Sequence, residues 1–223
     1  MKIVPTRNGV LNNRFDTSGT FTVKYVFNTD DTGSGAVEVG TIIKWFLNGV
    51  LFKEGTFSAA EPPIEVDENG NPLPTPLRLL PGELVGGTTA HVIGNQVYVE
   101  VTPRTLLVTG ETVRSSTIIV ENSLLIVKNV TITPLEPTSQ STLEVNYDIE
   151  DADIANGTQT DQSEIKWLKS LNGVDFEEQT ELRDQTIVGA SETALGEYWK
   201  VIVLPFDGLD TGSSVESNVV RIQ

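Results

Sequence analysis

The tripeptide Ile-Lys-Trp occurs twice in this chain, at 43–45 and at 165–167, and the two occurrences lie 122 positions apart. Residues upstream keep the same spacing: Val23 recurs as Val145, Tyr25 as Tyr147, and Asp31 as Asp153. A repeat of this length in 223 residues indicates two copies of one domain of about 100 residues. We therefore predict two domains, 1–123 and 124–223, each organised around a tryptophan in the middle of a strand.

The residues around each tryptophan have the pattern of β-structure. Phe21–Phe27 and Leu143–Ile149 alternate apolar and mostly polar residues, which is the period of a half-buried strand. Asn-Gly pairs at 48–49 and 172–173 suit tight hairpin turns, because both positions tolerate positive φ. No segment has a convincing helical pattern. Many short strands separated by turn signals predict an all-β chain of two tandem β-sandwiches.

Three tryptophans are candidates for the two cores. Trp45 and Trp167 lie in the middle of apolar strands, and Trp199 has the spacing of an inward face with Val201 and Val203. We expect all three to be structural core residues.

The first copy is longer than the second. Near the end of each copy the spacing is 102 instead of 122, so that Pro103 corresponds to Pro205 and Gly110 to Gly212. About 20 extra residues therefore lie between Trp45 and Pro103, and the proline-rich segment at about 56–87 is the natural place for them. Its prolines disfavour a central strand or a helix.

This proline-rich segment is also unusually apolar. A disordered loop is one interpretation, but its leucines favour an ordered arm that contacts a neighbouring molecule. The leucines proposed as assembly contacts are Leu73, Leu77, Leu79 and Leu80.

Composition excludes several kinds of site. There is no cysteine, and His91 is the only histidine, so a thiolate metal site, a cysteine nucleophile or a multi-histidine site is not expected. We predict no catalytic residues, no cofactor and no enzymatic activity. The net charge of −16 disfavours nucleic acid and anionic membranes as partners. No apolar run approaches the roughly 20 residues of a membrane span, and the start of the chain has no signal-peptide pattern.

Two acidic positions are weak candidates for a calcium site. Asp151 and Asp153 begin an alternating series of hard oxygen ligands, but Ala155 interrupts it. A solvated acidic loop without metal is the favoured interpretation. Aromatic residues are a second alternative, as stacking faces for a sugar, although a core or scattered surface role is favoured for them: Tyr25, Tyr98, Tyr147, Tyr198 and Trp199.

The second copy resembles a bacterial immunoglobulin-like repeat that occurs in tandem in large surface and secreted proteins, with similar modules on tailed-phage virions. The resemblance covers nearly all of 128–223. It is carried by Tyr147, Asp151, Asp153, Ile165-Lys166-Trp167, Asn172-Gly173, Trp199, Val203, Pro205, Asp207-Gly208, Gly212 and Ser217. The first copy matches more weakly, with Arg104-Thr105 where the second has Phe206-Asp207, and both copies lack the cysteine pair of antibody domains.

The resemblance implies tandem immunoglobulin-like domains and a structural role in a phage virion, as a capsid decoration or fibre protein made in the host cytoplasm. The charge is uneven: 1–123 carries −4 and 124–223 carries −12. We expect the first domain to attach to other virion proteins, the acidic second domain to project, and the chain to form homo-oligomers. The alternative is an adhesive or carbohydrate-binding module of a bacterial surface protein, with a cell-surface glycan as partner.

Overall fold

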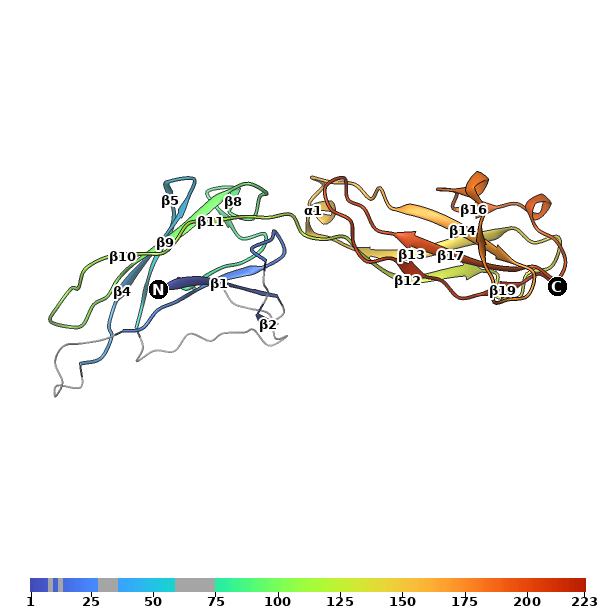
Figure 1. Ribbon diagram of the computed structural model, residues 1–223. Coiled ribbons are helices and arrows are strands. Elements are labelled where there is room, and N and C mark those ends of the chain that lie inside the picture. Colours follow the sequence, from blue (N-terminus) through green and yellow to red (C-terminus); the bar gives the residue numbers. More distant parts are fainter. Residues whose placement is uncertain (8–9, 12–13, 28–35, 59–74) are drawn as a thin grey trace. The chain divides into compact units, whose positions relative to one another are not determined.

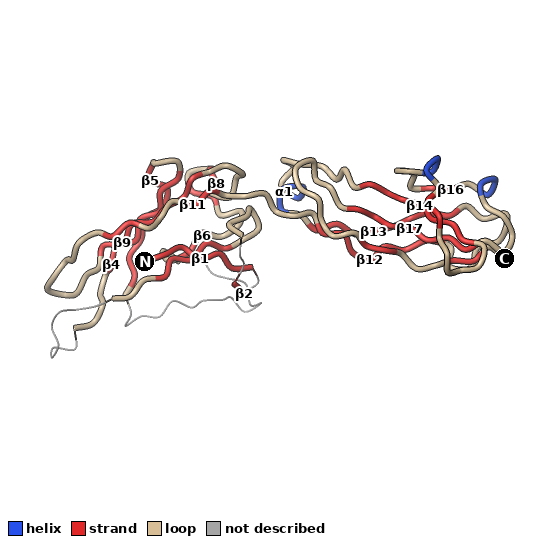
Figure 2. The backbone as a smooth tube through the Cα atoms, in the orientation of Figure 1, coloured by secondary structure: helices blue, strands red, loops and turns tan. Residues whose placement is uncertain are grey.

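The computed structural model describes residues 1–7, 10–11, 14–27, 36–58 and 75–223 (Figure 1). The chain divides into two compact units, Met1–Asn122 and Ser123–Gln223, called here the first and the second unit. Strands dominate both units, and the helices among the described residues are short (Figure 2). The predicted all-β class is confirmed.

The first unit consists of two main antiparallel sheets. One has the order β2-β1-β3-β6, and the other has the order β10-β9-β4-β5, with β11 also pairing with β9. A small hairpin, β7-β8, is separate from both. The bounds are β1 Lys2–Arg7, β2 Val10–Leu11, β3 Thr20–Lys24, β4 Thr41–Leu47, β5 Val50–Phe57, β6 Arg78–Leu79, β7 Leu84–Val85, β8 Thr88–Thr89, β9 Gln96–Thr102, β10 Val113–Arg114 and β11 Ile118–Ile119.

The second unit repeats this plan. One sheet has the order β12-β13-β16, and the other has the order β15-β14-β17-β18, with β19 also pairing with β17. The strand bounds are β12 Ile126–Thr133, β13 Leu143–Glu150, β14 Glu164–Ser170, β15 Glu177–Glu178, β16 Ile187–Val188, β17 Tyr198–Leu204, β18 Val215–Glu216 and β19 Val220–Arg221. The short helices are α1 Ala152–Ala155, η1 Thr180–Leu182 and η2 Ala190–Glu192.

The strand order identifies the type of sandwich. In the second unit the first, second and fifth strands form one sheet, and the third, fourth, sixth and seventh form the other. This exchange of strands between the sheets is the arrangement of an immunoglobulin-like sandwich. The first unit places β1, β3 and β6 in one sheet and β4, β5, β9 and β10 in the other, which is the same order. The chain is therefore two tandem immunoglobulin-like β-sandwiches.

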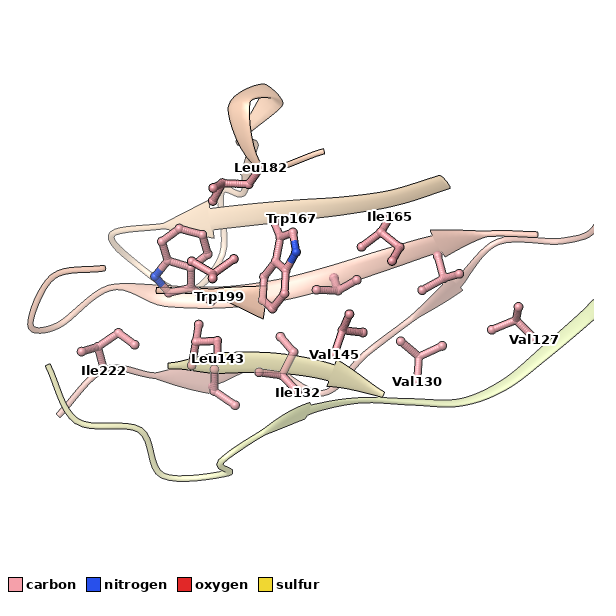
Figure 3. Packing of buried hydrophobic residues seen from close by; sticks show 14 residues of the cluster. Val127, Val130, Ile132, Leu143, Val145, Ile165, Trp167, Leu182, Trp199 and Ile222 are labelled. Atoms are coloured by element: carbon pink, nitrogen blue, oxygen red, sulfur yellow. The ribbon is translucent and has the colours of Figure 1, made fainter. Parts of the chain in front are cut away.

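A tryptophan fills each core between the two sheets. The side chains of Trp45, Trp167 and Trp199 are all fully buried. In the second unit the rings of Trp167 and Trp199 meet edge to face, with centroids 6.3 Å apart (Figure 3). Residues of both sheets, such as Leu143 and Val201, pack around them.

Each central tryptophan also donates one hydrogen bond across the core, to the chain segment that leads into the opposite sheet. Trp45 Nε1 donates to Pro76 O at 2.8 Å, and Trp167 Nε1 donates to Gln185 O at 2.7 Å. Because a buried indole N–H needs an acceptor, this bond fixes the segment that leads into β6 or β16. The two short strands are therefore equivalent parts of the two units.

This equivalence corrects the interpretation of the proline-rich segment. Leu79, on β6, pairs with Phe21 on β3 and lies in the core with 1% of its surface exposed. The prolines were expected to prevent a central strand or a helix here, and β6 is neither, because it is a two-residue strand at the edge of its sheet. Sequence separation between the tryptophan and its acceptor is 31 in the first unit and 18 in the second, so 13 of the extra residues precede Pro76.

A serine is placed identically in the last part of each sandwich. Ser115 Oγ accepts from Val99 N at 3.0 Å and donates to Ser116 O, while Ser217 Oγ accepts from Val201 N at 2.9 Å and donates to Asn218 O. These bonds satisfy backbone groups at the gap between β10 and β11 and at the gap between β18 and β19. The repeat therefore extends to individual hydrogen bonds.

Candidate interaction surface

The leucines predicted as assembly contacts do not form one exposed surface. Leu79 belongs to the core, and Leu77 is half-buried and packs against the same core. Leu80 is also only partly exposed, and Leu73 lies outside the described residues. The expectation that Leu79 is an exposed contact is therefore corrected, because β6 needs this side chain to fill the space beside Phe21.

The acidic pair predicted as a solvated loop is buried. Asp151 and Asp153 expose only 7% and 4% of their surface. Asp151 Oδ1 accepts from Asp153 N at 2.7 Å and from Ile154 N at 3.0 Å, which caps α1, and Ser123 Oγ donates to Asp153 Oδ2 at 2.8 Å. Burial raises the pKa of Asp151. Within the described ranges, no group of three or more histidine, cysteine or acidic side chains gathers as metal ligands.

The aromatic residues considered as sugar-stacking faces are largely occupied by the protein itself. Trp199 is in the core, and Tyr98 lies between the ring of Phe46, with centroids 4.6 Å apart, and the guanidinium of Arg114 at 3.6 Å. The hydroxyl of Tyr147 donates to Asp161 Oδ2 at 3.0 Å, and burial raises the pKa of Tyr147 to about 12. Tyr25 donates to Glu38 in the equivalent way.

The turn between β9 and β10 presents the largest concentration of exposed aliphatic side chains in the described sequence. Leu106, Leu107 and Val108 are consecutive, with 84%, 94% and 63% of their surfaces exposed. The backbone beneath them is ordered by hydrogen bonds. Thr105 N donates to Val108 O at 2.9 Å, and Gly110 N donates to Pro103 O at 2.8 Å. We call the three exposed residues 106–108 the apolar tip.

The second unit has the same turn with different side chains. Thr105 Oγ1 accepts from the backbone N–H groups of Leu107 and Val108, and Asp207 Oδ1 accepts from those of Leu209 and Asp210. Both units also close the turn with an isolated bridge, Arg104 to Thr109 and Phe206 to Thr211. The tip of the second unit reads Gly208-Leu209-Asp210 where the first reads Leu106-Leu107-Val108.

The contrast shows that the fold does not require an apolar tip. The second unit builds the same turn with one leucine, whereas the first exposes three aliphatic side chains in succession. Clustered exposed apolar surface on a soluble domain is typical of a contact site. The sequence does contain a sign of this tip. Between the matched proline and glycine, the second copy reads Phe-Asp-Gly-Leu-Asp-Thr and the first reads Arg-Thr-Leu-Leu-Val-Thr.

Comparison with known proteins gives structural neighbours only. No family model matches the chain, and no curated protein matches it. Among solved structures, the amphioxus IgVJ-C2 molecule is similar at 12% identity and a TM-score of 0.28, over 88% of this chain and 93% of that one. Chicken CNTN1 FN1-FN3 domains align at 12% identity and a TM-score of 0.29, over 99% of this chain and 65% of theirs.

A third neighbour is a Ca²⁺-stabilized adhesin with which an Antarctic bacterium binds ice, at 16% identity and a TM-score of 0.24. The alignment covers 92% of this chain and 43% of the adhesin. The TM-score is low in all three cases, so the fold assignment comes from the strand order and strand pairing described above.

In the described part of the chain, no helix has both the length and the apolar character needed to cross a membrane.

Proposed function

We propose that this chain is a non-enzymatic structural module that attaches to a larger assembly through the apolar tip of its first unit. The observation that carries the proposal is the consecutive exposure of Leu106, Leu107 and Val108 on an ordered turn. An ordered turn loses little conformational entropy on docking, so most of the apolar burial contributes to binding.

The shape of the tip indicates what it fits. Three aliphatic side chains on a narrow turn cover far less than the about 800 Å² that each partner contributes to a standard interface. They act as a plug for an apolar pocket, where burying one leucine stabilises a complex by roughly 1.5–3 kcal/mol. The partner in this proposal is a protein with a matching pocket.

The proposed setting is a tailed-phage virion, in which the chain is a capsid decoration or fibre protein. The sequence resemblance supports this part of the proposal. The uneven charge fits it, since the second unit carries −12 and the first −4, and a strongly acidic unit is suited to projecting into solvent. The alternative is an adhesive module that binds a glycan on a cell surface. The described aromatic residues discussed above offer no open face on which a sugar could stack.

The attachment is tested with Leu107→Asn and with the double change Leu106→Asn and Leu107→Asn. The matched control is Leu209→Asn, at the equivalent turn of the second unit, where Leu209 is 62% exposed. In a pull-down with purified phage particles, the tip variants should lose most of the particle-bound fraction and the control should keep it.

Equal particle binding by the wild type, the control and both tip variants would place attachment elsewhere. Binding of the wild type to a glycan array and not to particles would instead support the adhesive alternative. Because the tip residues are exposed, all variants are expected to keep the wild-type melting temperature, which separates loss of binding from loss of fold.

A further inference from the structure

A second apolar surface lies on the first unit, on the outer face of the sheet that contains Trp45. Alternation along β4 points Ile43 and Trp45 into the core, and Ile42 and Phe46 away from it. Cross-strand pairing puts Leu51 and Tyr98 beside Phe46 on this outer face. Ile119 is on the same face, because it pairs with Gln96, two residues from Tyr98.

The second unit carries mostly polar side chains at the same places. By position in the repeat and by strand pairing, the equivalents of Ile42, Phe46, Leu51, Tyr98 and Ile119 are Glu164, Leu168, Glu178, Lys200 and Arg221. Lys200 there forms an ion pair with Glu216 at 3.0 Å. An immunoglobulin-like sheet of this chain therefore tolerates charge on its outer face, and the apolar residues of the first unit are not a requirement of the fold.

Two aliphatic side chains of this face are well exposed. Leu51 is 48% exposed and Ile119 is 58% exposed. Phe46 and Tyr98 lie between them with their rings stacked in parallel, and Tyr98, which Phe46 and Arg114 cover, is only 9% exposed. The middle of the face is thus a rigid aromatic pair with an exposed aliphatic side chain on either side, which is the composition of an interface centre.

We propose that this outer face binds the same face of a second copy of the chain. The charges on the face support a second copy over another partner. Lys44 and Arg114 are balanced by Glu54 and Glu100, and Lys44 Nζ already lies 3.7 Å from Glu54 Oε2. A face with no excess of either sign offers little to a strongly charged partner.

In a two-fold dimer the same patch of both copies meets. Two copies of a chain with a net charge of −16 repel each other, and this neutral patch is a place where they can meet without adding to that repulsion. The area fits a weak dimer. The strands β4 and β9 each have seven residues, which at about 3.3 Å per residue and about 4.8 Å between four strands gives a face of roughly 20 by 20 Å. This footprint of about 400 Å² is about half of the about 800 Å² that each partner contributes to a standard interface, so the pairing should be reversible and depend on protein concentration.

The test is sedimentation equilibrium of the whole chain over the micromolar to submillimolar range. The wild type should show a reversible monomer–dimer equilibrium. Ile119→Arg and Leu51→Glu, which introduce the residues of the second unit, should each weaken dimerisation about tenfold or more. The matched control is Leu195→Glu, at a 73% exposed leucine of the second unit, and it should leave the equilibrium unchanged.

A measurement on the wild type makes the test independent of how the variants fold. Hydroxyl-radical footprinting should show less oxidation of Leu51 and Phe46 at high protein concentration, with no change at Leu171 in the second unit. A wild type that stays monomeric at the highest concentration overturns the proposal, and so does a dimer that both face variants leave intact. Loss of the dimer in Leu107→Asn but not in Ile119→Arg also overturns it, and assigns self-association to the apolar tip.

Discussion

Trp45 and Trp167 occupy the same place in their units, fully buried between two sheets and hydrogen-bonded through the indole to the segment before a two-residue strand. Ser115 and Ser217 also make the same three hydrogen bonds in both units. The units differ elsewhere, at the tip of the turn before β10 or β18 and on the outer face of the tryptophan sheet. Features that both units share are those that the sandwich needs, and features of one unit alone are candidates for function.

The largest expected effect is on the shared tryptophans. Trp45→Ala and Trp167→Ala should each lower the free energy of unfolding of their own unit by about 3–5 kcal/mol, through the cavity that they leave. The second unit should lose more, because Trp199 packs edge-on against Trp167 and would face the cavity. Hydrogen exchange measured by mass spectrometry reports the two units separately. If either substitution deprotects both units together, they do not have independent cores.

The next prediction concerns β6, the strand hidden in the proline-rich segment. Leu79→Ala should destabilise the first unit by about 2–5 kcal/mol, since Leu79 is 1% exposed and packs in the core. The neighbouring exposed Leu84, at 66%, is the control, and Leu84→Ala should change stability by less than about 0.5 kcal/mol. Equal effects of the two changes in urea unfolding would contradict the place of Leu79 in the core.

A consequence follows for replacement of the whole segment. Exchanging 61–87 for a short glycine-serine linker would remove both Leu79 and Pro76, the acceptor of the Trp45 indole. The first unit should then fail to fold, and only a replacement that ends before Thr75 tests the extra residues alone.

Local patterns in the sequence were sufficient for most of the fold. Alternation around Phe21 and Leu143, the tryptophan strands and the Asn-Gly turns each depend on neighbouring residues, so they predict strands and hairpins directly. The strand β6 was missed because its two residues pair with β3, and Pro76 before it bonds to Trp45, only in the tertiary structure. Nothing local distinguishes such a strand from a loop between prolines.

The candidate surface was harder to predict for a related reason. Leu106-Leu107-Val108 has the composition of a buried strand, and only the turn geometry set by Thr105 and Gly110 exposes it. Comparing the two copies residue by residue is what identifies it, because Asp207 shows that the position belongs to a turn. Burial of Asp151 and Asp153 was missed because Ser123, their partner, lies about 30 residues away in sequence.

The two units should also respond differently to acid, through His91, the only histidine of the chain. Its Nε2 donates to Gly19 O at 2.8 Å, its ring stacks on Phe21, and it is 5% exposed. Burial lowers the pKa of His91 from 6.5 to about 4, although the Gly19 carbonyl and the nearby Glu83 and Asp16 favour the charged form.

The unfolded chain therefore binds a proton between about pH 6.5 and 4 that the folded chain does not. This contribution to stability is present above about pH 6.5 and is lost as the pH falls toward 4, by about 3 kcal/mol in the first unit. The measurement is the pH dependence of unfolding of the first unit. His91→Gln keeps a donor for Gly19 O and should flatten this dependence, and a slope that persists in that variant would assign it to carboxylates.

A smaller difference is expected at the glycine that closes each turn. A Cβ on Gly212 would lie 2.4 Å from Leu125 O, a backbone atom, whereas a Cβ on Gly110 would lie 2.9 Å from Cγ of Pro103. Gly212→Ala must displace backbone and should cost about 1–3 kcal/mol in the second unit. Gly110→Ala meets a proline ring that can shift slightly, and its effect should be smaller. Calorimetry of both variants decides the order, and a larger loss for Gly110→Ala would contradict it.

The smallest predicted effect concerns the residue that orders the apolar tip. Thr105 Oγ1 accepts from Leu107 N at 3.2 Å and from Val108 N at 3.0 Å, and Asp207 makes the equivalent pair of bonds in the second unit. Thr105→Ala leaves both N–H groups to water on an exposed turn, so the first unit should lose only about 1 kcal/mol. Thr105→Asp restores the acceptor in the form that the second unit uses, and stability should return to within about 0.5 kcal/mol of the wild type.

The order of the tip distinguishes Thr105→Ala from Thr105→Asp better than global stability does. Amide exchange at Leu107 and Val108 should speed up in Thr105→Ala and return toward the wild-type rate in Thr105→Asp, because only an acceptor at position 105 holds these two N–H groups. Binding to particles should follow the same order if the tip docks as a preformed plug, since a mobile tip must be ordered again on binding. Fast exchange in Thr105→Ala with unchanged binding would show that the aliphatic side chains suffice for attachment and that their arrangement on the turn does not contribute.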